Sequence, residues 1–373
     1  MSRELLLLAV GDVAADRPDP RRCFDHVRAR VREADVAFCQ LEVNLTTRGV
    51  RLPQARHTMR GDPAIAAAIR DAGFHVVSFA GNHCMDWGME AFQDTIDNLQ
   101  EAELQVVGVG ANIAAARQPV FVERDGVRIA FLAYSTILPM GYWAEASRPG
   151  CAPMRAFTIY EQIEHDQPGT PARIHTYPQR DDLKALVSDV RQARAQADFV
   201  AVSLHWGIHF VPAVLADYQR DVAYAAIDAG ADAILGHHAH ILKGVEIYKD
   251  RPIFYSLANF AVDLRMDKAH AESKSFKEIQ ALSPDWVPDF DSLYNFPPAS
   301  RMSIAAELVL HEGGLRDVAI RPLYINSSAQ PEIMQPEDPR FEQIRAYLED
   351  ISAQADLQTR FKQRGDLIAL EAA

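Results

Sequence analysis

The sequence AGFHVVSFAGNHCMDWGMEAFQDTIDNL at residues 72–99 joins two hydrophobic patterns within one short stretch. Residues 75–82 form an apolar run of strand length, whereas apolar residues return at helical spacing over 91–103. The polar pair Asn82-His83 stands between them, where the strand is predicted to end. This order predicts a strand, a turn that carries polar side chains, and a helix, as in one unit of an α/β sheet.

Strand and helix patterns of the same kind flank this unit on both sides. Apolar runs at 4–10 and 35–42 alternate with helical patterns at 21–34 and 63–74. Further on, Asp125-Gly126 suits the tight turn of a hairpin. The later part predicts strands at 104–110, 198–207, 231–238, 305–314 and 315–325, hairpins at 119–134 and 244–260, and helices at 181–196, 215–230 and 341–355. The sequence therefore predicts an α/β protein with a mixed sheet.

The overall composition is that of a folded globular protein. Of the 373 residues, 48% are apolar and 24% are charged, and the formal net charge is −13. This acidic balance argues against nucleic acid or an anionic membrane as a partner. The four cysteines form no CxxC pair, so the sequence predicts neither a disulfide framework nor a structural zinc site.

The apolar run near the amino terminus, Leu5 to Val10, is interpreted as a buried first strand. It is too short for the core of a signal peptide or for a membrane span. We therefore expect a cytoplasmic protein without a membrane anchor. The oligomeric state stays open, because the sequence has no heptad pattern.

Two stretches interrupt the regular pattern, at about 138–179 and 264–300. Both are rich in proline, aromatic and charged residues, and long loops on α/β scaffolds often carry function. We interpret them as lid-like insertions within one domain at 1–330, followed by a helical tail at 331–373. Simple packing on the core explains their aromatic residues equally well. The aromatic residues proposed as substrate contacts include Tyr142 and Trp143.

Metal-competent side chains directly follow five of the predicted strands. They lie in Gly11-Asp12, Leu41-Glu42-Val43-Asn44, Gly81-Asn82-His83, Leu204-His205-Trp206-Gly207 and Gly236-His237-His238-Ala239-His240. The carboxyl ends of parallel strands open into one crevice, so we expect these side chains to meet. Carboxylates, imidazoles and an amide oxygen suit Mn²⁺, Zn²⁺ or Fe²⁺ better than Ca²⁺. The sequence therefore predicts one or two divalent ions, with Mn²⁺ as the first choice.

Each motif taken alone has an ordinary structural explanation. An isolated aspartate after a strand more often caps a helix, and an isolated Asn-His pair is usually a turn. The spacing of His238 and His240 is more specific, because alternate residues of an extended segment point to the same side. His237 is then predicted to point away and to support the site from behind.

With these motifs the chain resembles the bacterial CapA family of poly-γ-glutamate capsule biosynthesis proteins, whose fold is that of the calcineurin-like metallophosphoesterases. The resemblance spans about residues 5–263. It rests on GDV at 11–13, QLEVNLT at 40–46, the stretch 72–99, VVGVGAN at 106–112, SLHWG at 203–207 and the segment 230–260. It implies a four-layer α/β/β/α sandwich with a two-metal centre.

The resemblance also implies roles for individual residues. The implied metal ligands are Asp12 and His240 for one ion, Asn82, His205 and His238 for the other, and Glu42 as the bridge. His83 corresponds to a catalytic histidine that acts as general acid or stabilises developing charge, Arg60 to an anion-binding arginine, and Asn259 to a residue that borders the site. Ala14 departs from the pattern, because the superfamily usually has a ligand histidine there. His209 replaces a residue that is often acidic; it is either a substrate contact or a polar loop residue.

Three functions fit these observations. The first is a metal-dependent hydrolase in which metal-activated water attacks an amide, lactam, lactone or ester bond of a small molecule. The second is a phosphoesterase that uses the same metals, although few lysines or arginines lie near the motifs to neutralise phosphate. The third is a non-catalytic protein of poly-γ-glutamate capsule assembly. The retained set of candidate ligands favours catalysis over the third.

Overall fold

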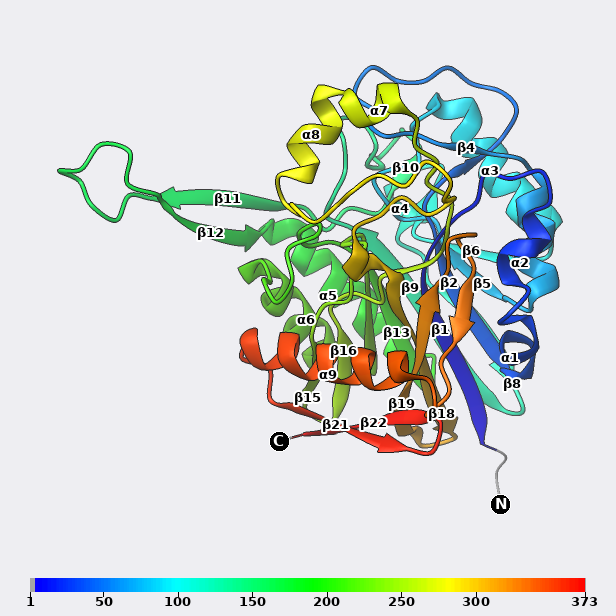
Figure 1. Cartoon of the computed structure of the whole chain (residues 1–373). Coiled ribbons are helices and arrows are strands. Elements are labelled where there is room, and N and C mark those ends of the chain that lie inside the picture. Colours follow the sequence, from blue (N-terminus) through cyan, green and yellow to red (C-terminus); the bar gives the residue numbers. More distant parts are fainter. Residues whose placement is uncertain (1–3, 373) are drawn as a thin grey trace.

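Strand β1 (Leu5–Ala14) lies in the interior of the larger of two main sheets in the computed structural model, which describes residues 4–372 (Figure 1). It pairs in parallel with β2 and β17 and antiparallel with β18. Nearly all of its side chains are buried, as expected for a strand that is covered on both faces. The apolar run Leu5 to Val10 is thus a core strand, as the sequence predicts.

The larger sheet has ten strands and is mixed. Its main path runs β21-β22-β19-β18-β1-β2-β5-β6, with β17 beside β1 and β20 beside β19. Its other strands are β2 (Val36–Leu41), β5 (Val76–Ser78), β6 (Gln105–Val107), β17 (Asn259–Val262), β18 (Met302–His311), β19 (Gly314–Ile325), β20 (Pro331–Ile333), β21 (Thr359–Arg364) and β22 (Leu367–Ala372).

The smaller sheet has six strands in the order β15-β16-β14-β13-β9-β8. Its centre is parallel, because β13 pairs in parallel with both β9 and β14. The hairpin of β8 and β9 turns at Asp125 and Gly126, both with positive φ, as the sequence predicts. The strands are β8 (Val120–Arg124), β9 (Val127–Ser135), β13 (Phe199–His205), β14 (Ala233–His237), β15 (Val245–Tyr248) and β16 (Arg251–Phe254).

The two sheets pack face to face, and helices cover their outer faces (Figure 1). Phe38 of β2 stacks on Phe131 of β9 with ring centroids 5.6 Å apart, which marks the buried layer between the sheets. Helices α1 (Arg28–Glu33), α2 (Ala64–Ala72) and α3 (Gly88–Glu101) lie against the larger sheet, and α5 (Arg180–Arg194) and α6 (Asp217–Ala229) against the smaller one. The predicted α/β/β/α sandwich is confirmed.

Local sequence signals explain where these helices begin and end. The side chain of Gln179 accepts hydrogen bonds from the first backbone N–H groups of α5, and acidic residues follow in its first turn. Helices α2 and α6 end at Gly73 and Gly230, whose φ angles of 108° and 118° suit glycine best. The short elements are η1 (Pro20–Phe24), β3 (Asn44–Leu45), β4 (Arg60–Gly61), β7 (Val109–Gly110), α4 (Ile113–Ala116), β10 (Gly150–Cys151) and η2 (Pro298–Arg301).

The segment predicted as a helical tail is only partly helical. Helix α9 (Pro339–Gln354) lies there, but β20 precedes it and the hairpin of β21 and β22 follows it. Both β20 and β22 pair with β19, so the segment completes the larger sheet. The alternating side chains of residues 359–364 explain this result, because Thr359 and Phe361 face the core while their neighbours face solvent.

The first predicted insertion divides into two parts. Residues near 138 stay close to the body, whereas β11 (Ala156–Glu161) and β12 (Arg173–Pro178) form a two-stranded arm that projects away from both sheets (Figure 1). No residue of the arm lines the cavity over the candidate site, so this part does not form the lid that the sequence predicts. The second insertion contains α7 (Lys268–Glu272) and α8 (Lys274–Gln280), and it does line a cavity.

Candidate metal centre

The predicted metal-competent side chains converge at the carboxyl ends of strands from both sheets. Asp12 lies at an irregularity near the end of β1, where the pairing register with β17 shifts. Glu42 follows β2, and Asn82 comes after β5. From the smaller sheet, His205 is the last residue of β13, and His238 and His240 follow β14. The centre therefore lies where the open ends of the two sheets meet, as expected for parallel strands.

Two of these strand ends carry a glycine, Gly11 directly before Asp12 and Gly236 two residues before His238, because the neighbouring backbone leaves no room for a larger residue. A Cβ atom on Gly11 would lie 1.9 Å from the carbonyl oxygen of Ala258. On Gly236 it would lie 2.3 Å from the carbonyl oxygen of Tyr255. The close approach of the backbones fixes the two strand ends that carry the candidate ligands.

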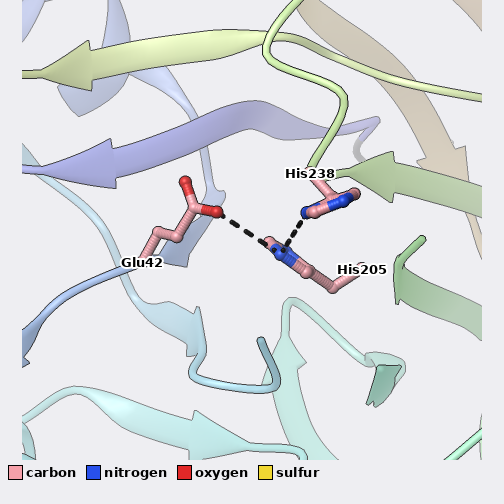
Figure 2. A group of neighbouring side chains, drawn as sticks. All are labelled: Glu42, His205 and His238. Carbon is pink, nitrogen blue, oxygen red and sulfur yellow. Dashed lines mark hydrogen bonds and ion pairs between the residues drawn. The ribbon is translucent and has the colours of Figure 1, made fainter. Parts of the chain in front are cut away.

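Two groups of ligand atoms form at this point, and they share one carboxylate. Glu42, His205 and His238 make one group, and Asp12, Glu42 and His240 make the other, with all ligand atoms of a group within 4.8 Å of one another. Figure 2 shows the first group, whose three side chains point toward one another. The Nε2 atom of His205 lies 3.4 Å from Oε1 of Glu42 and 3.2 Å from Nδ1 of His238. Glu42 is thus common to both groups, and the resemblance implies it as the bridge between two ions.

Asn82 adds an oxygen to the first group. Its Oδ1 atom lies 2.6 Å from Nε2 of His205 and 3.2 Å from Nδ1 of His238. In the second group, Nε2 of His240 lies 3.8 Å from Oε1 of Glu42. Each group thus offers both nitrogen and oxygen donors, which suits Mn²⁺, Fe²⁺ or Zn²⁺.

The electrostatics of the centre also fit divalent ions. Burial raises the pKa of Glu42 to about 7, with a further contribution from the Asp12 carboxylate, while His240 opposes the shift. Burial lowers the pKa of His205 to about 4 and that of His238 well below its usual value. The imidazoles are therefore neutral with free lone pairs, as metal ligands must be. The buried Oε1 atom of Glu42 has no hydrogen-bond partner within residues 4–372, as a metal ligand would.

Side chains behind the ligands orient them. The Nδ1 atom of His240 lies 2.8 Å from Oδ1 of Asn259, which leaves Nε2 free to face Glu42. Asn259 is itself fixed, because its amide donates to the Tyr294 hydroxyl at 2.8 Å. Asn259 is buried behind His240 and does not line the cavity, so it supports a ligand and is not placed to contact substrate.

His237 has the supporting place that the sequence predicts. Its Nδ1 atom lies 3.2 Å from Oδ1 of Asp12, and both side chains are fully buried. Burial alone would raise the pKa of Asp12, but the adjacent imidazole of His237 and those of His205 and His240 lower it. Asp12 is therefore held as a carboxylate.

His83 lies at the cavity beside the two ligand groups. Its Nδ1 atom is 2.6 Å from Oδ2 of Asp86, and the hydroxyl of Tyr142 donates to the other oxygen of Asp86 at 3.0 Å. Burial opposes a charged ring here, but the hydrogen bond to Asp86 and the carboxylates of Asp86, Glu42 and Asp12 raise the pKa of His83. Tyr142 therefore lies behind His83 and does not contact the cavity, contrary to its predicted role as a substrate contact.

A cavity of about 670 Å³ opens over the centre. His209 lines it and packs on His238 with ring centroids 3.8 Å apart. The Nε2 atom of His209 is buried without a hydrogen-bond partner in the described part of the chain, so it is free to meet a ligand. The apolar lining consists of Ala14, Met59, Ile137, Leu138, Pro139, Met140, Phe210, Val262, Leu264, Met266, Phe276, Ile279, Trp286 and Phe296.

Two further predicted residues lie outside this cavity. Arg60 is exposed, and its guanidinium lies over the ring of Trp87 at 4.6 Å, so it is not placed to bind substrate. The arginine that lines the cavity is Arg56, in a loop without a periodic pattern. Trp143 contacts the exposed Glu145 through its indole nitrogen and is likewise not a lining residue.

Sequence reasoning missed other lining groups as well. His57 and His270 line the cavity, and their rings stack with centroids 5.9 Å apart, although the sequence separates them widely. Asp86 was also missed. Its position three residues after His83 is a signal, because that spacing brings two side chains together in a turn.

The fold and the site together define an α/β/β/α protein with a candidate two-ion centre at the strand ends. The sequence profile of the family described as Bacterial capsule synthesis protein PGA_cap matches residues 6–264. The chain belongs to this family, which confirms the resemblance noted in the sequence. The matched region contains every candidate metal ligand.

Individual relatives agree with this assignment. The chain is 34% identical over 196 residues to the capsule biosynthesis protein CapA of Bacillus anthracis, covering 52% of this chain and 42% of that protein. It is 31% identical over 196 residues to the PGA biosynthesis protein CapA of Bacillus subtilis (strain 168), covering 52% and 44%. The matches thus span less than half the length of these two relatives.

Among solved structures, the calcineurin-like phosphoesterase YfkN from Bacillus subtilis matches with a TM-score of 0.43 at 13% identity, covering 94% of this chain and 97% of that chain. A hypothetical protein from Thermus thermophilus matches with a TM-score of 0.48 at 16% identity, covering 85% of this chain and 98% of that chain.

In residues 4–372, no helix combines the length and the apolar character that a membrane crossing requires.

Proposed function

We propose that the chain is a metal-dependent hydrolase that attacks an amide, lactam, lactone or ester carbonyl of a small molecule. The observation that carries this proposal is the pair of ligand groups that share Glu42 and open into a cavity beside His83. Two divalent ions, when bound at such a centre, lower the pKa of a coordinated water and polarise a substrate oxygen. Mn²⁺ is the proposed ion, with Zn²⁺ and Fe²⁺ as alternatives.

Proton delivery to the leaving group is the proposed task of His83. Its Nδ1 atom is held by Asp86, so Nε2 is the ring nitrogen that can transfer a proton within the cavity. Tyr142 holds Asp86 in turn, which fixes the direction of the imidazole. His209 contributes a hydrogen-bonding nitrogen on the other side of His238.

A phosphoesterase that uses the same centre is the alternative reaction. Phosphate recognition generally relies on several arginine or lysine side chains. In the described chain, Arg56 is the one arginine or lysine that lines the cavity. A carbonyl substrate therefore fits the surroundings of the centre better than a phosphoester.

A non-catalytic role in capsule assembly is the other alternative, because the two Bacillus relatives are named for capsule and PGA biosynthesis. Such a role needs neither convergent neutral imidazoles nor a shared buried carboxylate. The convergence of these groups on one cavity therefore supports a catalytic role.

Metal analysis combined with a turnover assay tests the proposal. We expect near-stoichiometric metal in the purified chain and Mn²⁺-stimulated turnover on a panel of phosphoesters, esters and cyclic amides. The double variant His205→Ala, His238→Ala is expected to lose metal and turnover. The matched control replaces two exposed histidines, His26→Ala and His165→Ala, and should keep both.

The ligand groups also predict different effects of single substitutions. Asp12→Ala is expected to remove about one ion, whereas Glu42→Ala affects both because it belongs to both groups. Metal binding without turnover on any member of the panel would refute the hydrolase. Turnover confined to phosphoesters would establish the alternative reaction.

A further inference from the structure

We infer that the substrate carries a bulky, uncharged apolar group, which packs against an aromatic wall formed by Phe210, Trp286 and Phe296 next to the metal ligands. This inference rests on the proposed hydrolase function and names its substrate class. The three residues line the cavity, and none is a predicted ligand.

The aromatic wall is a continuous surface. The rings of Phe210 and Trp286 have centroids 5.2 Å apart, and those of Trp286 and Phe296 stack at 6.3 Å. Phe210 and Trp286 are 5% and 3% exposed, so both are held firmly by their surroundings. A rigid aromatic surface in a cavity binds apolar groups through area and shape.

The wall directly adjoins the candidate metal centre. The ring of His240 lies 5.1 Å from that of Phe296 and 5.8 Å from that of Phe210, measured between centroids. A bond placed for hydrolysis at the centre therefore has one of its substituents against the wall. Met266 and Leu264 continue the apolar surface beyond the rings.

The charges around the cavity disfavour an anionic substituent at this position. Of the carboxylates that line the cavity, Glu42 is a candidate ion ligand and Asp86 is paired with His83, and Arg56 is the single arginine or lysine of the lining within residues 4–372. The three rings of the wall carry no charge, so an ionised carboxylate packed against them would lose its hydration without gaining a charge partner from the wall. A chain of free γ-linked glutamates, with one carboxylate on every unit, is therefore a poor fit.

The size of the cavity is consistent with a small molecule. Its volume of about 670 Å³ lies within the usual range for small-molecule sites. The segment that carries Trp286 and Phe296 also lines the cavity through Ser275, whose hydroxyl oxygen lies 2.8 Å from Nε2 of His57.

Two series of simple esters test the inference on the unaltered chain with Mn²⁺. One series varies the acyl group from acetyl to hexanoyl and phenylacetyl with ethanol as the leaving group, and includes the anionic succinyl ester. The other varies the alcohol with acetyl constant. Acid release is followed by titration. In the series whose varied group packs against the wall, we expect kcat/KM to rise about fourfold per added methylene. The kcat/KM of the succinyl ester should be at least about tenfold lower than that of its uncharged counterpart.

Substitutions in the aromatic wall test whether the dependence of kcat/KM on chain length arises there. Trp286→Ala should flatten the dependence on chain length while metal content is retained, and the milder Phe296→Leu serves if Trp286→Ala fails to fold. Trp143→Ala is the matched control, because this tryptophan lies in the other insertion and outside the cavity. Turnover that is independent of chain length, or that favours the succinyl ester, would overturn the inference alone. Absence of turnover with every ester, and with the cyclic amides of the panel as well, would overturn the proposed function and the inference with it.

Discussion

Removal of one buried hydroxyl, in Tyr142→Phe, should slow the proposed reaction without disturbing the metal ligands. The hydroxyl donates to Asp86 at 3.0 Å, and Asp86 in turn lies 2.6 Å from Nδ1 of His83. A hydrogen bond to a charged group contributes about 1.5–3 kcal/mol. If the transition state depends on the direction of His83, kcat/KM should fall about 10- to 100-fold, since about 1.4 kcal/mol corresponds to a factor of ten.

Tyr134→Phe is the matched control for this experiment. Tyr134 is also buried, and its hydroxyl donates to a carboxylate oxygen of Asp189 at 2.9 Å, away from the cavity. Both variants should lose similar stability in urea unfolding and keep their metal, so a difference in ester turnover reports on His83. Equal turnover in the two variants would refute the proposed chain from Tyr142 through Asp86 to His83.

Three further predictions concern stability. Gly236→Ala places a Cβ atom 2.3 Å from the carbonyl oxygen of Tyr255, so urea titration should show that the free energy of unfolding falls by at least about 3 kcal/mol. A decrease of less than about 1 kcal/mol would show that the strands can separate there. Burial lowers the pKa of His75 to about 4, with smaller contributions from Arg124 and Arg70. In the unfolded chain this pKa is about 6.5. The stability that comes from neutral His75 is therefore present above a pH of about 6.5 and is lost as the pH falls toward 4. In His75→Gln, the free energy of unfolding should fall by about 1–2 kcal/mol less over this pH range, after allowance for the partial exposure of the side chain. When each free ion is at about a hundred times its Kd, its removal by a chelator should lower the melting temperature by about 3 °C per ion. An unchanged melting temperature would contradict metal binding by the folded chain.

Much of the fold follows from local pattern. The apolar runs at 5–10 and 36–41 are covered on both faces, so they have no polar alternation, and their length alone marks them as strands. The candidate ligands were predictable for a related reason. Each lies at or shortly after the end of such a run, and the carboxyl ends of parallel strands converge regardless of the helices that connect the strands.

Other features depend on contacts that no local pattern specifies. Arg56 lies in a loop four residues before Arg60, which begins the short strand β4, and only tertiary packing decides which of the two reaches the cavity. The same is true of the aromatic residues, since Trp286 lines the cavity and Trp143 does not. The hairpin at 359–372 is a different case, because Gly365-Asp366 between two alternating segments is a turn signal that the sequence itself carries.

The projecting arm of β11 and β12 is a place where we expect a cut in the chain to leave two pieces held together by the smaller sheet. Within residues 4–372, the strands of the arm pair with each other alone, and β9 before the arm and β13 after it are hydrogen-bonded neighbours in the smaller sheet. A protease that nicks the exposed tip would leave Asp12, Glu42, Asn82 and His83 on one fragment and His205, His238 and His240 on the other. Separately produced halves would each hold an incomplete centre, and their reassembly could be followed as the recovery of metal binding, which makes the arm a natural junction for a split-protein reporter.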